Sequence, residues 1–198
     1  MSGIIGQNQG RDSGLIKAPA GGGGMTLIGH TSITSSTASV DFTSGMDNAY
    51  PLYKLFLSNV KHASDGGQVY IQVYQGGSLN TSSHYTKVDG MFASEYSNAI
   101  YTSTSNGATN AQWRLHSGVG NSTGEYMTGE FLFFNGAGDE SYPHMFEVSM
   151  ARMANTHNHM RVGLNTCINA GNITGIKIYH SAANISLGEF GLFGINTS

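Results

Sequence analysis

Apolar and polar residues alternate along most of the chain from residue 25 onward. In Gln68–Gln75, three aliphatic side chains share one face, while Tyr70, Gln72 and Tyr74 share the other. Alternation with a period of two indicates a β-strand with one face on a core and the other facing water or a partner. The same pattern predicts further strands over Met25–His30, Ala38–Thr43, Leu52–Val60, Ala111–His116, Gly129–Asn135, Pro143–Met153, Met160–Ile168, Ile176–Tyr179 and Leu187–Ile195.

Two of the predicted strands have strongly contrasted faces. Their apolar positions are Phe146, Val148, Met150, Met160, Val162 and Leu164, and the polar positions between them are Glu147, Ser149, Arg161 and Asn165. The alternation predicts that the apolar positions face a core and that Glu147 faces outward. The run Phe131–Phe134 is apolar on both faces, which indicates a central strand covered on both sides by core or interface.

Turn-forming residues separate these strands, as in Asp65-Gly66-Gly67 and Gln75-Gly76-Gly77. No window of about twelve residues carries a helical apolar stripe. Short strands and turns at this spacing predict an all-β fold, an antiparallel β-sandwich of the jelly-roll-like type. The stretch Leu79–Asn110 is the least regular, and we expect it to form a long surface excursion.

The first 24 residues have a different character, with two apolar pairs among Gly, Gln, Asn and Ser. They end on Gly21–Gly24, which predicts a flexible hinge. Fully extended, the segment spans up to about 80 Å, enough to reach another subunit. We therefore expect residues 1–24 to be an attachment arm and residues 25–198 to be the domain; the alternative is a frayed terminus without function. The expected contact residues of the arm are Ile4, Ile5, Arg11, Leu15, Ile16 and Lys17.

Composition narrows the range of partners. Only 11% of the residues are charged, the net charge is −3, and the Lys and Arg residues are scattered singly. Nucleic-acid binding needs clustered cations to neutralise phosphates, so we expect no nucleic-acid partner. No run approaches the roughly 18 apolar residues of a membrane span, so we expect no membrane association. A surface solvated by hydroxyls and amides is typical of β-rich proteins in fibres and capsids.

Candidate catalytic and metal-binding residues are sparse. His157 and His159 would share a strand face and form a weak candidate metal pair, although plain hairpin residues are the more common reading. The lone Cys167 is expected to be a small buried hydrophobe. The carboxylates that could form a glycosidase-like pair are Glu125, Glu130, Asp139, Glu140 and Glu147, and none has a distinctive spacing. We therefore expect no catalytic residues, no cofactor and no resident metal.

Three aromatic residues suggest a weak ligand face. Tyr70 and Tyr74 lie on the outer side of their predicted strand, and Trp113 begins a short run with Arg114 and His116. Such aromatics could stack on the sugars of a host surface glycan. The alternative is that they cover a second sheet or a subunit interface, where aromatics are also enriched.

Both ends of the chain carry a family resemblance, in SGIIGQNQGRDSGLIKA (residues 2–18) and ITGIKIYHSAANISLGEFGLFGI (residues 173–195). These segments resemble a group of virion structural proteins of tailed bacteriophages that are similar in length to this chain. In that group a short N-terminal arm precedes a jelly-roll-like β-sandwich. The resemblance implies a subunit that is assembled into the virion and displayed on the particle.

Two functions follow from these expectations. In the first, the protein is a non-enzymatic structural subunit, a capsid decoration (cement) or fibre protein, which forms a homotrimer and binds capsid or tail proteins through its arm. In the second, it is a receptor-binding tail fibre module whose sandwich binds a host glycan. The clear arm and the weak ligand face favour the first function.

Overall fold

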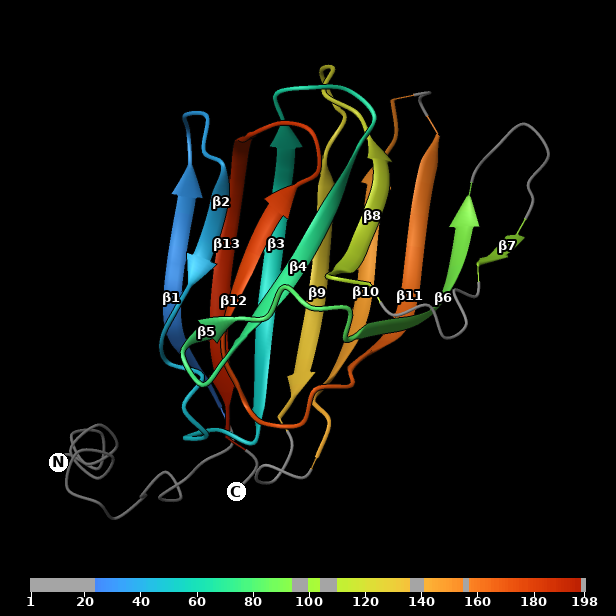
Figure 1. Cartoon of the computed structure of the whole chain (residues 1–198). Helices are drawn as coiled ribbons and strands as arrows, with labels where there is room; N and C mark the ends of the chain where they lie inside the picture. Colours follow the sequence, from blue (N-terminus) through green and yellow to red (C-terminus); the bar gives the residue numbers. More distant parts are fainter. Residues whose placement is uncertain (1–23, 94–99, 104–109, 136–140, 155–156, 197–198) are drawn as a thin grey trace, which may run out of the picture.

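The regular structure of this protein consists of β-strands. The computed structural model describes residues 24–93, 100–103, 110–135, 141–154 and 157–196, and its regular elements there are thirteen strands. The strands form two sheets in which every pairing is antiparallel (Figure 1). The all-β, antiparallel class predicted from the sequence is thereby confirmed.

The larger sheet has eight strands. Their order across the sheet is β1 (Met25–Ile33), β13 (Ile185–Ile195), β3 (Leu52–His62), β9 (Met127–Phe134), β10 (His144–Arg152), β11 (Asn158–Cys167), β6 (Tyr85–Ala93) and β7 (Ile100–Ser103). The smaller sheet contains β2 (Ser39–Phe42), β12 (Ile173–His180), β4 (Gly67–Gln75) and β5 (Ser78–Leu79), with β8 (Trp113–Val119) also paired to β4. In Figure 1 the smaller sheet lies in front of the middle of the larger one, and β11, β6 and β7 extend beyond β8.

The hydrophobic core lies between the two sheets. The larger sheet contributes fully buried side chains such as Leu55 and Phe131, and the smaller sheet contributes Ile71 and Ile176. Removing this apolar surface from water is the main driving force for stacking the sheets. The buried thiol of Cys167 belongs to the same core, as the sequence predicted.

Each segment predicted to be a strand overlaps an observed strand, but one region was predicted wrongly. Leu79–Asn110 is not only a surface excursion, because it contains β6, which pairs with β11 over nine residue pairs. It also contains β7, which pairs with β6 at the edge of the sheet. The alternation of β6 is easily missed, since its buried positions include the charged residues Lys87 and Asp89.

The orientation of β10 and β11 is the opposite of the predicted one. Glu147 and Arg161 are buried, whereas Phe146, Met150 and Leu164 are exposed. The prediction that Glu147 faces outward is therefore wrong. The physical reason is that the buried charges of β6, β10 and β11 pair with one another between the sheets.

Candidate functional site

The outer side of the larger sheet carries a large group of exposed apolar residues, here called the apolar sheet face. Its members come from β6, β9, β10 and β11 and are Val88, Phe92, Phe134, Phe146, Met150, Met160 and Leu164. Phe146 is 37% exposed, Leu164 51% and Met150 56%. A contiguous apolar patch of several hundred Å² is about as large as the largest one on a typical monomeric protein, and such a patch often marks an interaction site.

The strand register places these residues side by side. Phe146 lies opposite Leu164, and Leu164 lies opposite Val88 on the next strand. Two rows further along the strands, beyond Val148 and Val162, Met160 lies between Met150 and Phe92. Directly opposed residues on one face have Cβ atoms about 5 Å apart. On the other side of Phe146 lies the half-buried Leu132 of β9, so the apolar sheet face is continuous across four neighbouring strands.

Charged residues lie at the margins of the apolar sheet face. Glu130 on β9 forms an ion pair of 2.7 Å with Lys54 on the neighbouring strand β3. Arg152 is exposed at the end of β10. Between these margins lie the described outward positions of β9, β10, β11 and β6. Their side chains are apolar or uncharged and polar, and His144 lies near one end. The face can thus approach another surface without burying an unpaired charge.

Behind the apolar sheet face, four buried residues form an ionic cluster: Lys87, Asp89, Glu147 and Arg161. Lys87 Nζ lies 2.6 Å from Glu147 Oε1 and 3.6 Å from Asp89 Oδ2. The Arg161 guanidinium forms an ion pair with the same Asp89 oxygen. Two positive and two negative groups leave the ionic cluster neutral overall.

The electrostatics of the ionic cluster reflect burial and pairing. Burial raises the pKa of Glu147, and the neighbouring Lys87 ammonium opposes that rise. Burial likewise lowers the pKa of Lys87, and the Glu147 carboxylate is the main group that opposes this decrease. Asn165 Nδ2 donates a hydrogen bond of 3.3 Å to Glu147 Oε2, and Lys87 Nζ donates one of 2.5 Å to the Arg114 carbonyl oxygen. These contacts fix which side of β10 and β11 faces inward.

The three aromatic residues predicted to form a ligand face do not lie together. Trp113 is only 1% exposed, and its Nε1 donates to the Thr166 carbonyl oxygen at 3.3 Å. The expectation that it is an exposed aromatic is therefore wrong. Tyr70 is half-buried on the outer face of β4, and so is Tyr74, whose hydroxyl donates to Asp41 Oδ1 at 2.8 Å.

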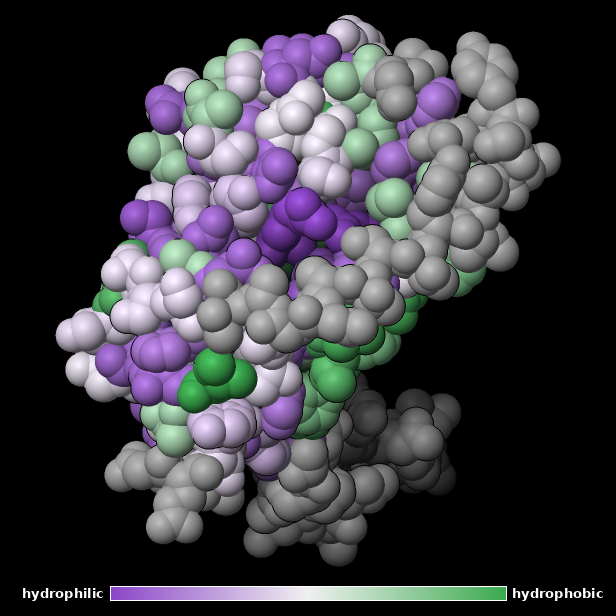
Figure 2. Space-filling model, turned by 45° about the vertical axis from the view of Figure 1, so that its right-hand side comes forward, coloured by the Kyte–Doolittle hydropathy of each residue, from purple (hydrophilic) through white to green (hydrophobic). Residues whose placement is uncertain are grey.

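Tyr70 and Trp113 nevertheless line one pocket, which Tyr74 does not reach. The pocket has a volume of about 220 Å³, and its other lining residues include Gln68, Lys87, Gln112 and Arg114. Figure 2 shows that strongly hydrophilic residues gather near the centre of the face in view. The sequence indicated Tyr70 and Trp113, but it gave no sign that Lys87 from a distant strand joins them.

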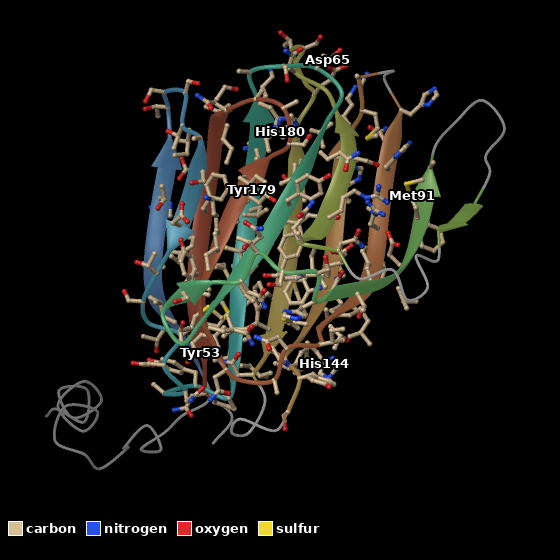
Figure 3. All side chains as sticks on the ribbon, in the orientation of Figure 1. Tyr53, Asp65, Met91, His144, Tyr179 and His180 are labelled. Atoms are coloured by element: carbon tan, nitrogen blue, oxygen red, sulfur yellow. The ribbon has the colours of Figure 1, made fainter. Side chains whose placement is uncertain are left out.

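Histidines form two buried contacts that the sequence did not predict. His62 and His180 stack with ring centroids 3.8 Å apart, at the end of the molecule where Asp65 lies (Figure 3). Burial, together with the neighbouring His180, lowers the pKa of His62 to about 3. The ring of His116 lies 5.9 Å from that of His159, and burial together with Arg161 lowers the pKa of His116 to about 3.

The structure places the candidate metal pair at the start of β11. His157 precedes the strand, and its carbonyl oxygen accepts a hydrogen bond of 2.8 Å from the Met153 amide. His159 lies on the buried side of β11. Within the described residues, no group of three or more His, Cys, Asp or Glu side chains is arranged to hold a metal ion.

The described candidate carboxylates lie in three separate settings. Glu125 is buried and accepts a hydrogen bond of 2.7 Å from the Ser122 amide, which stabilises a turn. Glu130 pairs with Lys54 on the outer face, and Glu147 belongs to the ionic cluster. Asp139 and Glu140 lie outside the described residues.

The predicted contact residues of the arm, which are Ile4, Ile5, Arg11, Leu15, Ile16 and Lys17, also lie outside the described residues. The described domain begins at Gly24, and β1 starts at Met25. In the part of the chain that the structure describes, no helix is long and apolar enough to cross a membrane.

Comparison with known proteins gives little similarity. No protein-family model matches the chain, and no curated protein matches its sequence. Among solved structures, dimeric latent PorU from Porphyromonas gingivalis has a TM-score of 0.15 and 13% sequence identity. The alignment covers 88% of this chain and 14% of PorU, so this chain spans a small part of that protein. A TM-score this low says nothing about the function of either protein.

Proposed function

We propose that this protein is a non-enzymatic structural subunit of a bacteriophage virion, which assembles with further copies of itself through the apolar sheet face. The observation that carries the assembly role is the continuous row of exposed apolar side chains on β6, β9, β10 and β11. The virion assignment is supported by the resemblance of residues 2–18 and 173–195 to virion structural proteins of tailed phages.

The size and charge of the face favour a second copy of this chain as its occupant. Strands lie about 4.8 Å apart and rise about 3.3 Å per residue. A patch that is four strands wide and seven residues long therefore has an area of roughly 400 Å², and one that spans all eight strands has roughly 900 Å². A stable interface needs about 800 Å² on each partner. From β9 to β1 the outer face also carries the apolar residues Phe56, Phe193 and Leu27, interspersed with the Lys54–Glu130 and His30–Glu189 pairs, so the whole outer face can supply this area. Copies of the four-strand apolar sheet face meet without like-charge repulsion, because its charges lie at the margins and the Lys54–Glu130 pair beside it is internally compensated.

A closed, symmetric oligomer would bury this face on every copy. The proposed state is a homotrimer in which the three larger sheets turn their outer faces toward a common axis. The sandwich belongs in this proposal to the jelly-roll-like type, and residues 1–24 form the arm that binds a capsid or tail protein. A capsid decoration (cement) protein and a fibre subunit both fit this arrangement.

The number of copies on purified particles tests this function. Quantitative mass spectrometry of particles should detect the protein in a fixed ratio to the major capsid protein. Hundreds of copies per particle would identify a capsid decoration protein, and a few dozen or fewer would identify a fibre subunit. Absence of the protein from washed, infectious particles would contradict a structural role in the virion.

A receptor-binding tail fibre module is the second candidate function. It is favoured by one observation, the pocket that Tyr70 and Trp113 share with two cationic side chains. In this function the sandwich would bind a glycan on the host surface, while the arm would again attach to the tail. Enzymatic cleavage of that glycan is not part of the proposal, because Glu125, Glu130 and Glu147 are engaged in separate structural contacts.

A further inference from the structure

The pocket lies where the smaller sheet ends and the larger sheet continues. Its walls come from β4 and β8 of the smaller sheet, and Lys87 reaches it from β6 of the larger sheet. The register pairs Tyr70 with Arg114, so these two side chains lie next to each other on the outer face of the smaller sheet. The phenol ring of Tyr70 and the guanidinium of Arg114 thus lie side by side at the pocket.

Arg114 supplies the pocket with an uncompensated positive charge. The ammonium of Lys87 is neutralised within the ionic cluster, at 2.6 Å from Glu147. Arg114 has no ion pair among the described residues, and its buried Nε has no hydrogen-bond partner there. A guanidinium binds a carboxylate through two parallel hydrogen bonds. The free donors of Arg114 are therefore suited to a ligand carboxylate.

The remaining walls suit the ring of a sugar. The Tyr70 hydroxyl donates to Gln68 Oε1, and the Tyr70 ring packs against the Tyr179 ring at 5.5 Å, so its orientation is fixed. A fixed aromatic ring can stack on the apolar face of a sugar with little loss of conformational entropy. Gln68 and Gln112 add amide groups that can bind hydroxyls. At about 220 Å³ the pocket is smaller than the usual site for a drug-sized ligand, which points to a single sugar residue.

We propose that this pocket binds one acidic sugar residue, a uronic acid, with its carboxylate on Arg114 and its ring against Tyr70. In a host polysaccharide such a residue would be one unit of a longer chain. The inference deepens the glycan-binding candidate function and rests on it for its biological role. It is independent of association through the apolar sheet face, which lies on the other sheet.

The test is a titration of the full-length protein with free glucuronate, in which saturation-transfer NMR measures binding. Glucose and acetate serve as probes for the neutral sugar and for the carboxylate alone. We expect glucuronate to bind with a dissociation constant on the order of 1 mM and each of the other two probes at least about tenfold more weakly. Arg114→Gln should weaken glucuronate binding by about tenfold or more, since a charge-assisted bidentate contact is lost.

Two further variants separate the pocket from general effects. Tyr70→Ala should weaken glucuronate binding by about threefold or more through loss of stacking. Arg152→Gln removes an exposed arginine that does not line the pocket and should leave binding unchanged. Equal binding of glucose and glucuronate, or unchanged glucuronate binding in a folded Arg114→Gln protein, would overturn the proposal. Acetate binding as tight as glucuronate binding would also overturn it, because the site would then recognise an anion and not a sugar. The oligomeric state is measured separately, so either proposal can fail alone.

Discussion

Phe146 and Glu147 are neighbours on β10, yet the phenyl ring is 37% exposed and the carboxylate is fully buried. The ring belongs to the apolar sheet face, and the carboxylate pairs with Lys87 at 2.6 Å between the sheets. One strand thus presents an apolar surface to the outside and an ion pair to the inside. This arrangement fits a subunit whose outer face is completed by another copy.

Removing the charge of Glu147 should strongly destabilise the fold. Glu147→Gln leaves the shape nearly unchanged but deprives the buried Lys87 of its nearest anion. Breaking a buried ion pair in this way costs about 3–5 kcal/mol of unfolding free energy. Urea unfolding followed by circular dichroism measures the loss. Glu130→Gln removes a matched but exposed ion pair with Lys54 and should cost only about 0–1 kcal/mol. Equal effects of the two variants would show that the ionic cluster does not stabilise the fold.

Stability should decrease on mild acidification because His62 is buried in its neutral form. Its pKa is lowered from 6.5 to about 3, so the unfolded chain binds this proton between those values and the folded chain does not. The unfolding free energy therefore falls as pH drops below 6.5, by about 1.4 kcal/mol per pH unit for each such histidine. His116, whose pKa is also about 3, contributes with the same sign.

Unfolding measured at pH 7 and at pH 5 tests this dependence. His62→Phe keeps a ring against His180 but cannot be protonated, so the variant should lose less stability between the two pH values than the wild type. His144→Gln, at the opposite end of the molecule from His180 (Figure 3), should behave like the wild type. A His62→Phe protein with an undiminished pH dependence would contradict the assignment.

The arm should be dispensable for folding. The hydrophobic core consists of residues from Ile33 to Leu192, and β1 begins at Met25. A protein that starts at Met25 should keep a β-type circular dichroism spectrum and a single cooperative thermal transition. It should also fail to join virions, because the proposed attachment segment is missing. Loss of the cooperative transition would show that residues 1–24 belong to the folded core.

The sequence was sufficient to predict the class of fold and the position of most strands. Period-two alternation depends only on backbone geometry, so Gln68–Gln75 and its counterparts were found where strands occur. β6 was missed because Lys87 and Asp89 at its buried positions resemble a solvent-facing pattern. Their partners, Glu147 and Arg161, lie far away in the sequence, and only the fold brings the four charges together.

The candidate site was predicted only in part. Alternation shows that the faces of β10 and β11 differ, but it does not say which face points inward. The usual assignment, with the apolar side buried, fails here because the charged side is neutralised by pairing and the apolar side is left outside. Trp113 was grouped with Tyr70 and Tyr74 as a possible ligand residue, although its indole packs edge-on against Tyr85 in the core.

Self-association through the apolar sheet face is the central claim, and a paired set of variants isolates it. Leu164→Glu places a charge in the middle of the face, where Leu164 lies between Phe146 and Val88. Burying that charge in an interface is costly unless it is paired, whereas in a monomer it faces water. Lys177→Glu introduces the same residue on the outer face of the smaller sheet and serves as the control.

Light scattering coupled to size exclusion at micromolar concentration is the most direct measurement. The wild type and Lys177→Glu should both have about three times the chain mass of 21.0 kDa, and Leu164→Glu should have the mass of one chain while remaining folded. If the wild type has the mass of two chains and Leu164→Glu has the mass of one, the proposed interface is supported and the oligomer is a dimer instead of a trimer. A wild-type protein that is monomeric in solution and on the particle, or an oligomer that Leu164→Glu leaves intact, would contradict the account.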